Sequence, residues 1–317
     1  MRILHITCNY PTKNHPVYGI FVKEQIDSLQ RLGIHCDVFF SNGKEEGGMR
    51  AHMASIAKVK RLLKENNYDV IHCHHSISAL ILLLAGGAFR NKCVVSYQND
   101  PTREFGGSFL FNILYPFFNR IIIKNSSPYL QKKKVRYIPN GTNADFFRPM
   151  NRSVCREKLG WVIDAYYILY MDSNAGTRIQ KRYDRYQAVL SILKKDYNNI
   201  VSVELTNTPR EMIPIYMNAC NLHLMTSDFE GSPNSVKECL CCNIPVVSTD
   251  VGNVKDMMGD IKGCYVTKEK DAAELAICVK EVLECKEVFN GRNQFLDKGY
   301  SIETVAIKLK DLYGEIL

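Results

Sequence analysis

Residues 227–252, SDFEGSPNSVKECLCCNIPVVSTDVG, form the most informative local pattern in the chain. An acidic loop follows the apolar strand LHLMTS (222–227), and Pro233 and Asn234 then open a predicted helix that precedes the strand IPVVSTD (244–250). This order of strand, loop, helix and strand indicates a βαβ unit in a parallel sheet. The backbone N–H groups exposed at such a helix start predict an anion-binding site.

Two carboxylates flank this helix start. Glu230 lies in the loop, Glu238 lies one turn inside the predicted helix, and Gly231 lets a ligand approach the backbone closely. A carboxylate readily accepts hydrogen bonds from two hydroxyls, and a nucleotide sugar carries diol pairs on both its sugar and its ribose. The residues alone leave two interpretations open: a nucleotide-sugar site, or an ordinary helix start with solvated acids.

The alternation of short apolar strands and helices extends outward from this motif over the whole chain, with a break at 147–161. Such alternation predicts parallel sheets covered by helices on both faces. We therefore predict an α/β protein with two Rossmann-like, doubly wound domains that face a cleft. The predicted domains are residues 1–147 and 148–301, followed by a closing helix at 302–317. Ligands of such sheets bind beyond the carboxyl ends of the strands.

Composition and charge narrow the class of protein. The 317 residues are 46% hydrophobic and 23% charged, which is typical of a globular protein and excludes global disorder. The longest uncharged runs, 76–89 and 108–119, are shorter than the roughly 20 residues of a membrane-spanning helix, and the N-terminus has no signal-peptide pattern. The 12 cysteines lack regular spacing, so we expect reduced thiols in a cytoplasmic protein. A net charge of +8 fits an anionic substrate or membrane surface and is too diffuse to indicate nucleic acid.

Five segments, in order, resemble glycosyltransferase family 4, whose members are retaining enzymes of GT-B fold. The segment EGSPNSVKE (230–238) followed by IPVVSTDVG (244–252) resembles the E-x7-E segment of that family. The other four are similar to its opening strand and helix, its third strand, its interdomain segment and its closing helix: residues 2–29, DVIHCH (69–74), VRYIPNGTNADFFRP (135–149) and YSIETVAIKLKDLYGEIL (300–317). The resemblance covers nearly the whole chain and implies a GT-B fold.

The resemblance also implies roles for individual residues. Glu238 matches the glutamate that binds the nucleotide ribose, and Glu230 matches the one at the donor sugar. Arg178 and Lys181 match a basic pair that neutralises the donor diphosphate, so no metal or other cofactor is expected. Gly231, Ser232 and Asn234 match the loop that contacts the sugar and the diphosphate. Ser235, which opens the predicted helix together with Asn234, completes the predicted nucleotide-sugar site.

Several positions depart from the family pattern or admit a second interpretation. The Gly-Arg stretch that usually precedes the basic pair is replaced by Asp172, Ser173 and Asn174, which leaves a solvated basic face as an alternative for Arg178 and Lys181. Gly19 matches a glycine-rich loop facing the diphosphate, with a plain turn as the alternative.

Three further residues bear on the chemistry of the first domain. Gln98 takes the place of a family histidine near the sugar. His72 and His74 share one face of a predicted strand, as two metal ligands would. We interpret them as core or cleft histidines, because the sequence offers no third ligand nearby.

The predicted acceptor side is short and rich in aromatic residues. Only residues 101–138 separate Asp100 from Pro139, where the family is usually longer. Aromatic residues within 105–118, followed by basic residues, suit a membrane interface and a lipid-linked acceptor. A buried helix with an ordinary basic loop is the alternative. The basic residues in question are Arg120, Lys124, Lys132, Lys133 and Lys134.

From the residues and the resemblance together we predict a glycosyltransferase. It would move a sugar from a nucleotide diphosphate donor, with UDP favoured over GDP, to a glycan or lipid-linked acceptor in bacterial surface polysaccharide synthesis. The expected location is the cytoplasm, at the inner face of the cell membrane, with no nucleic-acid partner. Two alternatives remain open: a GT-B sugar-nucleotide epimerase, and a non-catalytic subunit that binds a nucleotide sugar.

Overall fold

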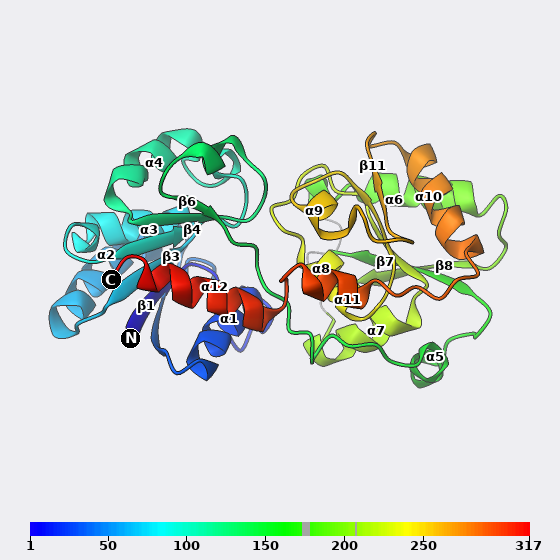
Figure 1. Ribbon diagram of the computed structural model, residues 1–317, viewed down its shortest axis with the longest axis horizontal. Helices are drawn as coiled ribbons and strands as arrows, with labels where there is room; N and C mark the ends of the chain where they lie inside the picture. The colour runs from blue at the N-terminus through cyan, green and yellow to red at the C-terminus, as the bar shows by residue number, and fades with distance from the viewer. Residues whose placement is uncertain (173–177, 207) are drawn as a thin grey trace. The chain divides into compact units, whose positions relative to one another are not determined.

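The computed structural model of the protein describes residues 1–172, 178–206 and 208–317, which divide into two units (Figure 1). Unit 1 comprises Met1–Gly141 together with Ile302–Leu317, and unit 2 comprises Thr142–Ser301. Each unit contains one sheet whose paired strands are all parallel among the described residues. The predicted α/β architecture with two doubly wound sheets is therefore confirmed.

Unit 1, whose residues are all described, has a six-stranded sheet in the order β2-β1-β3-β4-β5-β6. The strands are β1 (Arg2–Thr7), β2 (His35–Phe40), β3 (Val70–His74), β4 (Cys93–Ser96), β5 (Arg120–Ile123) and β6 (Val135–Tyr137). One apolar cluster packs the sheet against α2 (Met49–Glu65), α3 (Ser76–Leu84) and α4 (Gly107–Leu114). A second packs the opposite face against α1 (Ile20–Arg31) and α12 (Ile302–Gly314), which lie side by side in Figure 1. Burial of both faces explains why these strands are nearly continuous apolar runs.

Unit 2 has a five-stranded sheet among its described residues, in the order β11-β10-β9-β7-β8. The strands are β7 (Tyr166–Met171), β8 (Ile200–Leu205), β9 (Leu222–Met225), β10 (Val246–Thr249) and β11 (Tyr265–Thr267). The helices are α5 (Arg152–Leu159), α6 (Tyr183–Leu193), α7 (Ile213–Ala219), α8 (Asn234–Cys241), α9 (Val254–Met258), α10 (Ala272–Glu284) and α11 (Arg292–Asp297). Side chains of α7, α8 and α9 pack on one face of the sheet, and those of α6 and α10 pack on the other. Because β7 pairs with β9, the loops that follow these two strands begin at the same edge of the sheet.

The division between the units falls earlier than the boundary predicted after residue 147. Thr142 donates its N–H to the carbonyl oxygen of Tyr300 at 3.0 Å and forms a parallel bridge with Ser301. Phe147 is fully buried in the core of unit 2. Residues 142–147 thus belong to unit 2, because the aromatic anchor of the interdomain segment packs there. No described helix combines the length and apolar character needed to cross a membrane.

Candidate functional site

The loop that follows β9 leads directly into α8. Pro233 lies before the helix, with φ −65° and ψ 119°, and Asn234 is the first helical residue. The sequence predicted that Pro233 lies in the first helical turn. In the structure Pro233 instead precedes the helix and sets the direction in which the chain enters it. The Asn234 side chain accepts a hydrogen bond from buried Lys237 Nζ at 3.0 Å, which ties the helix start to its own first turn.

Glu230 and Lys181, which the sequence assigned to the same ligand, form an ion pair. Lys181 Nζ lies 2.5 Å from Glu230 Oε1, and the Ser227 hydroxyl donates to the same oxygen at 3.0 Å. Lys181 lies in a short 3-10 turn after β7, and both side chains are largely buried. The two residues come together because β7 and β9 are neighbouring strands. Lys181, the cation predicted to bind the diphosphate, is thus paired with Glu230, the carboxylate predicted to bind the sugar.

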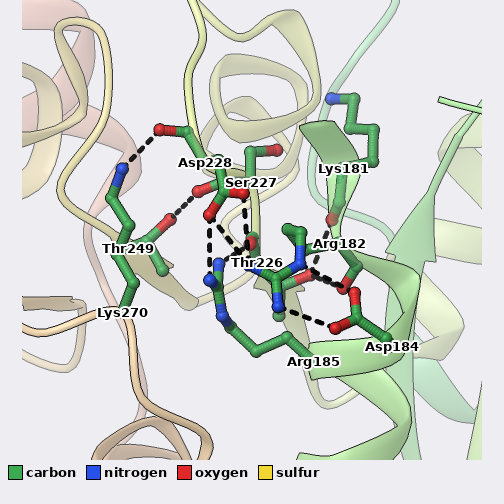
Figure 2. A network of polar contacts seen from close by, with 9 residues as sticks. All are labelled: Lys181, Arg182, Asp184, Arg185, Thr226, Ser227, Asp228, Thr249 and Lys270. Carbon is green, nitrogen blue, oxygen red and sulfur yellow. Dashed lines mark hydrogen bonds and ion pairs between the residues drawn. The ribbon is translucent and has the colours of Figure 1, made fainter. Parts of the chain in front are cut away.

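A network of polar contacts links the turn that contains Lys181 to residues 226–228, which precede Glu230 (Figure 2). Arg185 Nη2 lies 2.8 Å from Asp228 Oδ1, and Arg182 Nη1 lies 3.2 Å from Asp228 Oδ2. Burial alone would raise the pKa of Asp228, but hydrogen bonds from Arg185 and Arg182 hold it below its usual range. Lys270 donates to the backbone carbonyl of Asp228. The side chain of Asp228 thus fixes the loop two residues before Glu230.

Arg182 adopts a backbone conformation that is unusual for a residue with a side chain. Its φ of 52° and ψ of 57° lie in the left-handed region, which costs on the order of 1–3 kcal/mol. The Thr226 hydroxyl donates to the carbonyl of Lys181 at 2.9 Å, and Arg182 pairs with Asp184 and Asp228. These contacts maintain the strained turn that aims Lys181 at Glu230.

A glycine after β10 packs against the Glu230–Gly231 backbone. Gly252 has φ +58°, and a Cβ atom on it would lie 2.4 Å from the Gly231 carbonyl oxygen. Any side chain at position 252 would therefore displace the loop. The hydroxyl of Ser232, which follows Gly231 in the loop, is buried without a hydrogen-bond partner among the described residues.

Glu238 is also paired with a cation, one that sequence reasoning missed. Arg210 Nη1 donates to Glu238 Oε1 at 2.8 Å, and the Glu238 side chain is buried. The Arg210 guanidinium packs 4.8 Å from the ring centroid of Phe147 and 5.7 Å from that of Phe146. Arg210 and Glu238 are 28 residues apart in the sequence, and no motif in the chain links them.

Ser235 directs its hydroxyl into the core of unit 2. Its Oγ lies 3.1 Å from Nε2 of His223, and Nδ1 of His223 lies 3.0 Å from the carbonyl oxygen of Leu169. Burial lowers the pKa of His223 to about 4, so this imidazole is neutral near pH 7. The neutral ring donates from Nδ1 to the carbonyl and accepts at Nε2 from Ser235. The Ser235 side chain therefore anchors α8 to the sheet.

Arg178 pairs with a different carboxylate from the one that Lys181 contacts. Its Nε donates to Oδ1 of buried Asp172 at 3.2 Å, and about a third of its side chain is exposed (36%). Of the three residues that replace the family Gly-Arg stretch, Ser173 and Asn174 lie outside the described residues. The structure thus gives the two members of the basic pair different carboxylate partners.

In unit 1, Gly19 is required for steric reasons. It precedes α1 with φ +66°, and a Cβ atom there would lie 2.3 Å from the carbonyl carbon and oxygen of Asn9. The loop after β1 and the start of α1 are therefore in direct backbone contact. Gln98, at the position of the family histidine, accepts a hydrogen bond at Oε1 from Asn140 Nδ2 at 3.0 Å.

The structure supplies a third histidine beside His72 and His74. One ring nitrogen from each of His5, His72 and His74 lies within 4.8 Å of the others, and all three side chains are buried. The premise that no third ligand is nearby was wrong. His5 is distant in sequence but belongs to β1, which pairs with β3.

Comparison with known proteins shows the fold and gives a family-model match within unit 2. Residues 181–301 match the family model described as glycosyl transferases group 1. No curated protein matches the chain. Similar solved structures are sucrose-phosphate synthase from Thermosynechococcus elongatus (14% identity, 99% of both chains, TM-score 0.78) and HepE from Anabaena with UDP and glucose (15% identity, 99% of both chains, TM-score 0.74).

A third solved structure, the apo lipopolysaccharide outer core galactosyltransferase WaaB, matches over 100% of both chains at 13% identity and a TM-score of 0.71. At such identities the three structures establish the fold alone, and the family model matches only the segment that holds Lys181, Glu230 and Glu238. Residues 181–301 are thus similar to the glycosyl transferases group 1, and the chain has a GT-B fold.

Proposed function

We propose that the protein transfers a sugar, with retention of configuration, from a nucleoside diphosphate sugar to a glycan or lipid-linked acceptor in bacterial surface polysaccharide synthesis. The observation that carries the proposal is a pair of carboxylates on either side of the start of α8, largely buried Glu230 and buried Glu238. Lys181 pairs with Glu230, and Arg210 pairs with Glu238. UDP is favoured over GDP as the carrier, and the solved HepE structures hold UDP and UDP-glucose.

The Lys181–Glu230 ion pair suggests separate roles for the two residues, with Lys181 binding the diphosphate and Glu230 binding the sugar. An incoming diphosphate competes with Glu230 for the Lys181 ammonium, and the released carboxylate is then available to sugar hydroxyls. Lys181, Arg178 and the backbone N–H groups at the start of α8 would stabilise the charge that develops on the leaving diphosphate. No described side chain near Glu230 is an evident nucleophile, so retention would follow from attack on the face that the diphosphate leaves.

A donor assay separates this proposal from its two alternatives. Nucleotide sugars are first screened for binding by thermal shift, where a ligand at a hundred times its Kd stabilises by about 2.7 kcal/mol. The best ligand is then incubated without acceptor. Slow release of nucleoside diphosphate supports the transferase, an isomerised sugar nucleotide supports the epimerase, and tight binding without any turnover supports the non-catalytic subunit.

We expect transfer to proceed without a divalent metal ion, because side-chain cations take its place at the diphosphate. Donor turnover in EDTA should match turnover in added Mg²⁺ or Mn²⁺. The measurement is the initial rate of nucleoside diphosphate release in each condition. Loss of the rate in EDTA and its recovery with Mg²⁺ would refute this part of the proposal.

The surface around α4 favours contact with a membrane. Phe109 is 77% exposed and Ile113 is 39% exposed, while Leu110 and Phe111 on the other side of α4 are buried. The helix is thus packed on the core and also displays apolar side chains to solvent, which suits an interfacial element.

The basic residues that follow α4 do not all belong to this surface. Lys124 is fully buried, and burial lowers its pKa to about 7, so it adds no surface charge. Arg120 pairs with Glu315 at 3.1 Å. Lys132 and Lys134 lie 5.3 Å from the ring centroid of Tyr115, at the end of α4, and are the cations best placed beside the apolar face.

We therefore expect the protein to sediment with anionic liposomes at low salt and to be released as salt rises. Each Lys or Arg near such a surface contributes about 1 kcal/mol. Phe109→Ser should reduce the bound fraction severalfold at constant thermal stability. Val288→Ser is the matched control, because Val288 is 91% exposed in unit 2. Wild-type protein that stays in the supernatant at low salt would remove this support for a lipid-linked acceptor.

A further inference from the structure

One face of the sheet in unit 1 changes from apolar to polar along its strands. The face under α1 and α12 begins with apolar side chains such as Ile3 and Val70. Further toward the carboxyl ends, the same face carries buried polar side chains: His5, His72, His74, Ser96 and Lys124. A parallel sheet covered on both faces is ordinarily apolar, so this polar layer requires an explanation.

The three histidines form a compact triangle within this layer. His5 is the register partner of His72 across β1 and β3, and His74 is two residues further along β3. His5 Nδ1 lies 3.2 Å from His74 Nε2, and one ring nitrogen from each residue lies within 4.8 Å of the others. Ligand nitrogens in a tetrahedral zinc site with bonds of about 2.0–2.1 Å are roughly 3.3 Å apart. One pair is already at that separation, and modest side-chain rotation would bring in the third.

Hydrogen bonding alone does not satisfy the His5–His74 pair. Nε2 of His5 and Nδ1 of His74 are buried and have no hydrogen-bond partner among the residues that the structure describes. If neutral His5 donates to His74, the remaining proton of His74 has no acceptor; if His74 donates, the same is true of His5. Either tautomer leaves a buried N–H unsatisfied, at a cost of about 1–3 kcal/mol. The hydrogen bond between the two rings thus satisfies this fully buried pair only in part.

His72 differs because both of its nitrogens have partners. Its Nδ1 lies 2.6 Å from the hydroxyl of Tyr313 on α12, and its Nε2 lies 2.7 Å from the Ser96 hydroxyl. Whichever nitrogen faces the centre of the triangle, the other keeps a hydrogen bond that orients the ring, as the outer partners of metal-binding histidines do.

We propose that His5, His72 and His74 form a buried binding site for a first-row transition-metal ion that joins β1 to β3 beneath α12. Three imidazoles suit Zn²⁺, Co²⁺, Ni²⁺ or Cu²⁺, whereas Mg²⁺ and Ca²⁺ prefer oxygen ligands. The site lies in the core of unit 1, so its role is structural. Through Tyr313 it would also hold the C-terminal helix on the sheet.

The test uses the full chain, stripped of metal in denaturant and refolded with or without ZnCl₂ or CoCl₂. We expect about one equivalent of metal per folded chain, a higher Tm with Zn²⁺, and visible Co²⁺ bands of tetrahedral type without a thiolate charge-transfer band. His74→Gln should lower metal affinity at least tenfold, and Tyr313→Phe should lower it while all three ligands remain. His35→Gln, which changes an exposed histidine on β2, should bind metal as wild type does.

Two results would overturn the proposal. One is folded wild-type protein that retains no metal; the other is a His74→Gln variant that binds as tightly as wild type. A thiolate band in the Co²⁺ spectrum of wild-type protein would also overturn it, by assigning the metal to cysteines, even if the histidine variants failed to fold. Because the readouts are metal content, spectrum and Tm, a negative result leaves the proposed sugar transfer untouched.

Discussion

Glu230→Gln should lower the rate of sugar transfer at least tenfold while affinity for the free nucleoside diphosphate is unchanged or increases. Glutamine keeps the size of the side chain and can still accept from Ser227, but it removes the charge that pairs with Lys181. Contacts to sugar hydroxyls that strengthen as charge develops at the anomeric carbon act on the transition state, so their loss falls on the rate. A tenfold loss corresponds to about 1.4 kcal/mol.

The expected effect of Glu230→Gln on nucleoside diphosphate affinity follows from the ion pair between Lys181 and Glu230. In Glu230→Gln, the largely buried Lys181 loses its charged partner, and a bound diphosphate would supply a new one. Lys181→Gln should do the opposite and weaken diphosphate binding. A purely structural ion pair would instead make both variants lose thermal stability and affinity together.

The measurements are steady-state transfer, isothermal titration with nucleoside diphosphate, and Tm for each variant. Glu204→Gln is the matched control, because Glu204 is a hydrogen-bonded carboxylate on β8. Normal turnover with lost nucleotide affinity in Glu230→Gln would mean that the roles of Glu230 and Glu238 are exchanged.

The sequence predicted the sheets well because both faces of each sheet are covered by helices. Strands buried on two sides must be apolar throughout, and the loops between them therefore stand out as polar interruptions. The segment from Asp228 to Glu238 was such an interruption, and its position after a strand placed it at the ligand edge. The candidate site residues that follow β9 could thus be predicted from this single segment.

Contacts between segments that are distant in sequence were not readable, because they depend on strand order. Glu230 meets Lys181 only because β7 and β9 pair directly, and His5 meets His74 only because β1 pairs with β3. Arg210 reaches Glu238 from the segment after the edge strand β8. The family resemblance assigned Lys181 and Glu230 to the same donor, but nothing in the linear chain pointed to His5 or Arg210 as partners.

The boundary near residue 147 could not be placed from the sequence for a related reason. The segment 142–147 has no periodicity of its own, and its assignment depends on where Phe147 is buried. The Phe147 ring lies beneath Arg210, so the interdomain segment also supports the cation that pairs with Glu238. This contact connects the interdomain segment 135–149 to the predicted ribose site.

Glu238→Ala should weaken binding of the free nucleoside diphosphate by roughly tenfold to 150-fold, because a hydrogen bond to a charged group contributes about 1.5–3 kcal/mol. If Glu238 binds the ribose, the loss should be the same for the nucleoside diphosphate and the phosphate-free nucleoside, and inhibition by inorganic pyrophosphate should not change. Glu238→Ala also leaves partly buried Arg210 without this carboxylate, so Arg210→Gln and the double variant are needed to separate ligand binding from fold stability. A ribose role predicts that Arg210→Gln loses less affinity than Glu238→Ala at equal Tm. Pyrophosphate binding that weakens in parallel in Glu238→Ala would instead show that Glu238 acts by positioning the start of α8, and the ribose assignment would fail.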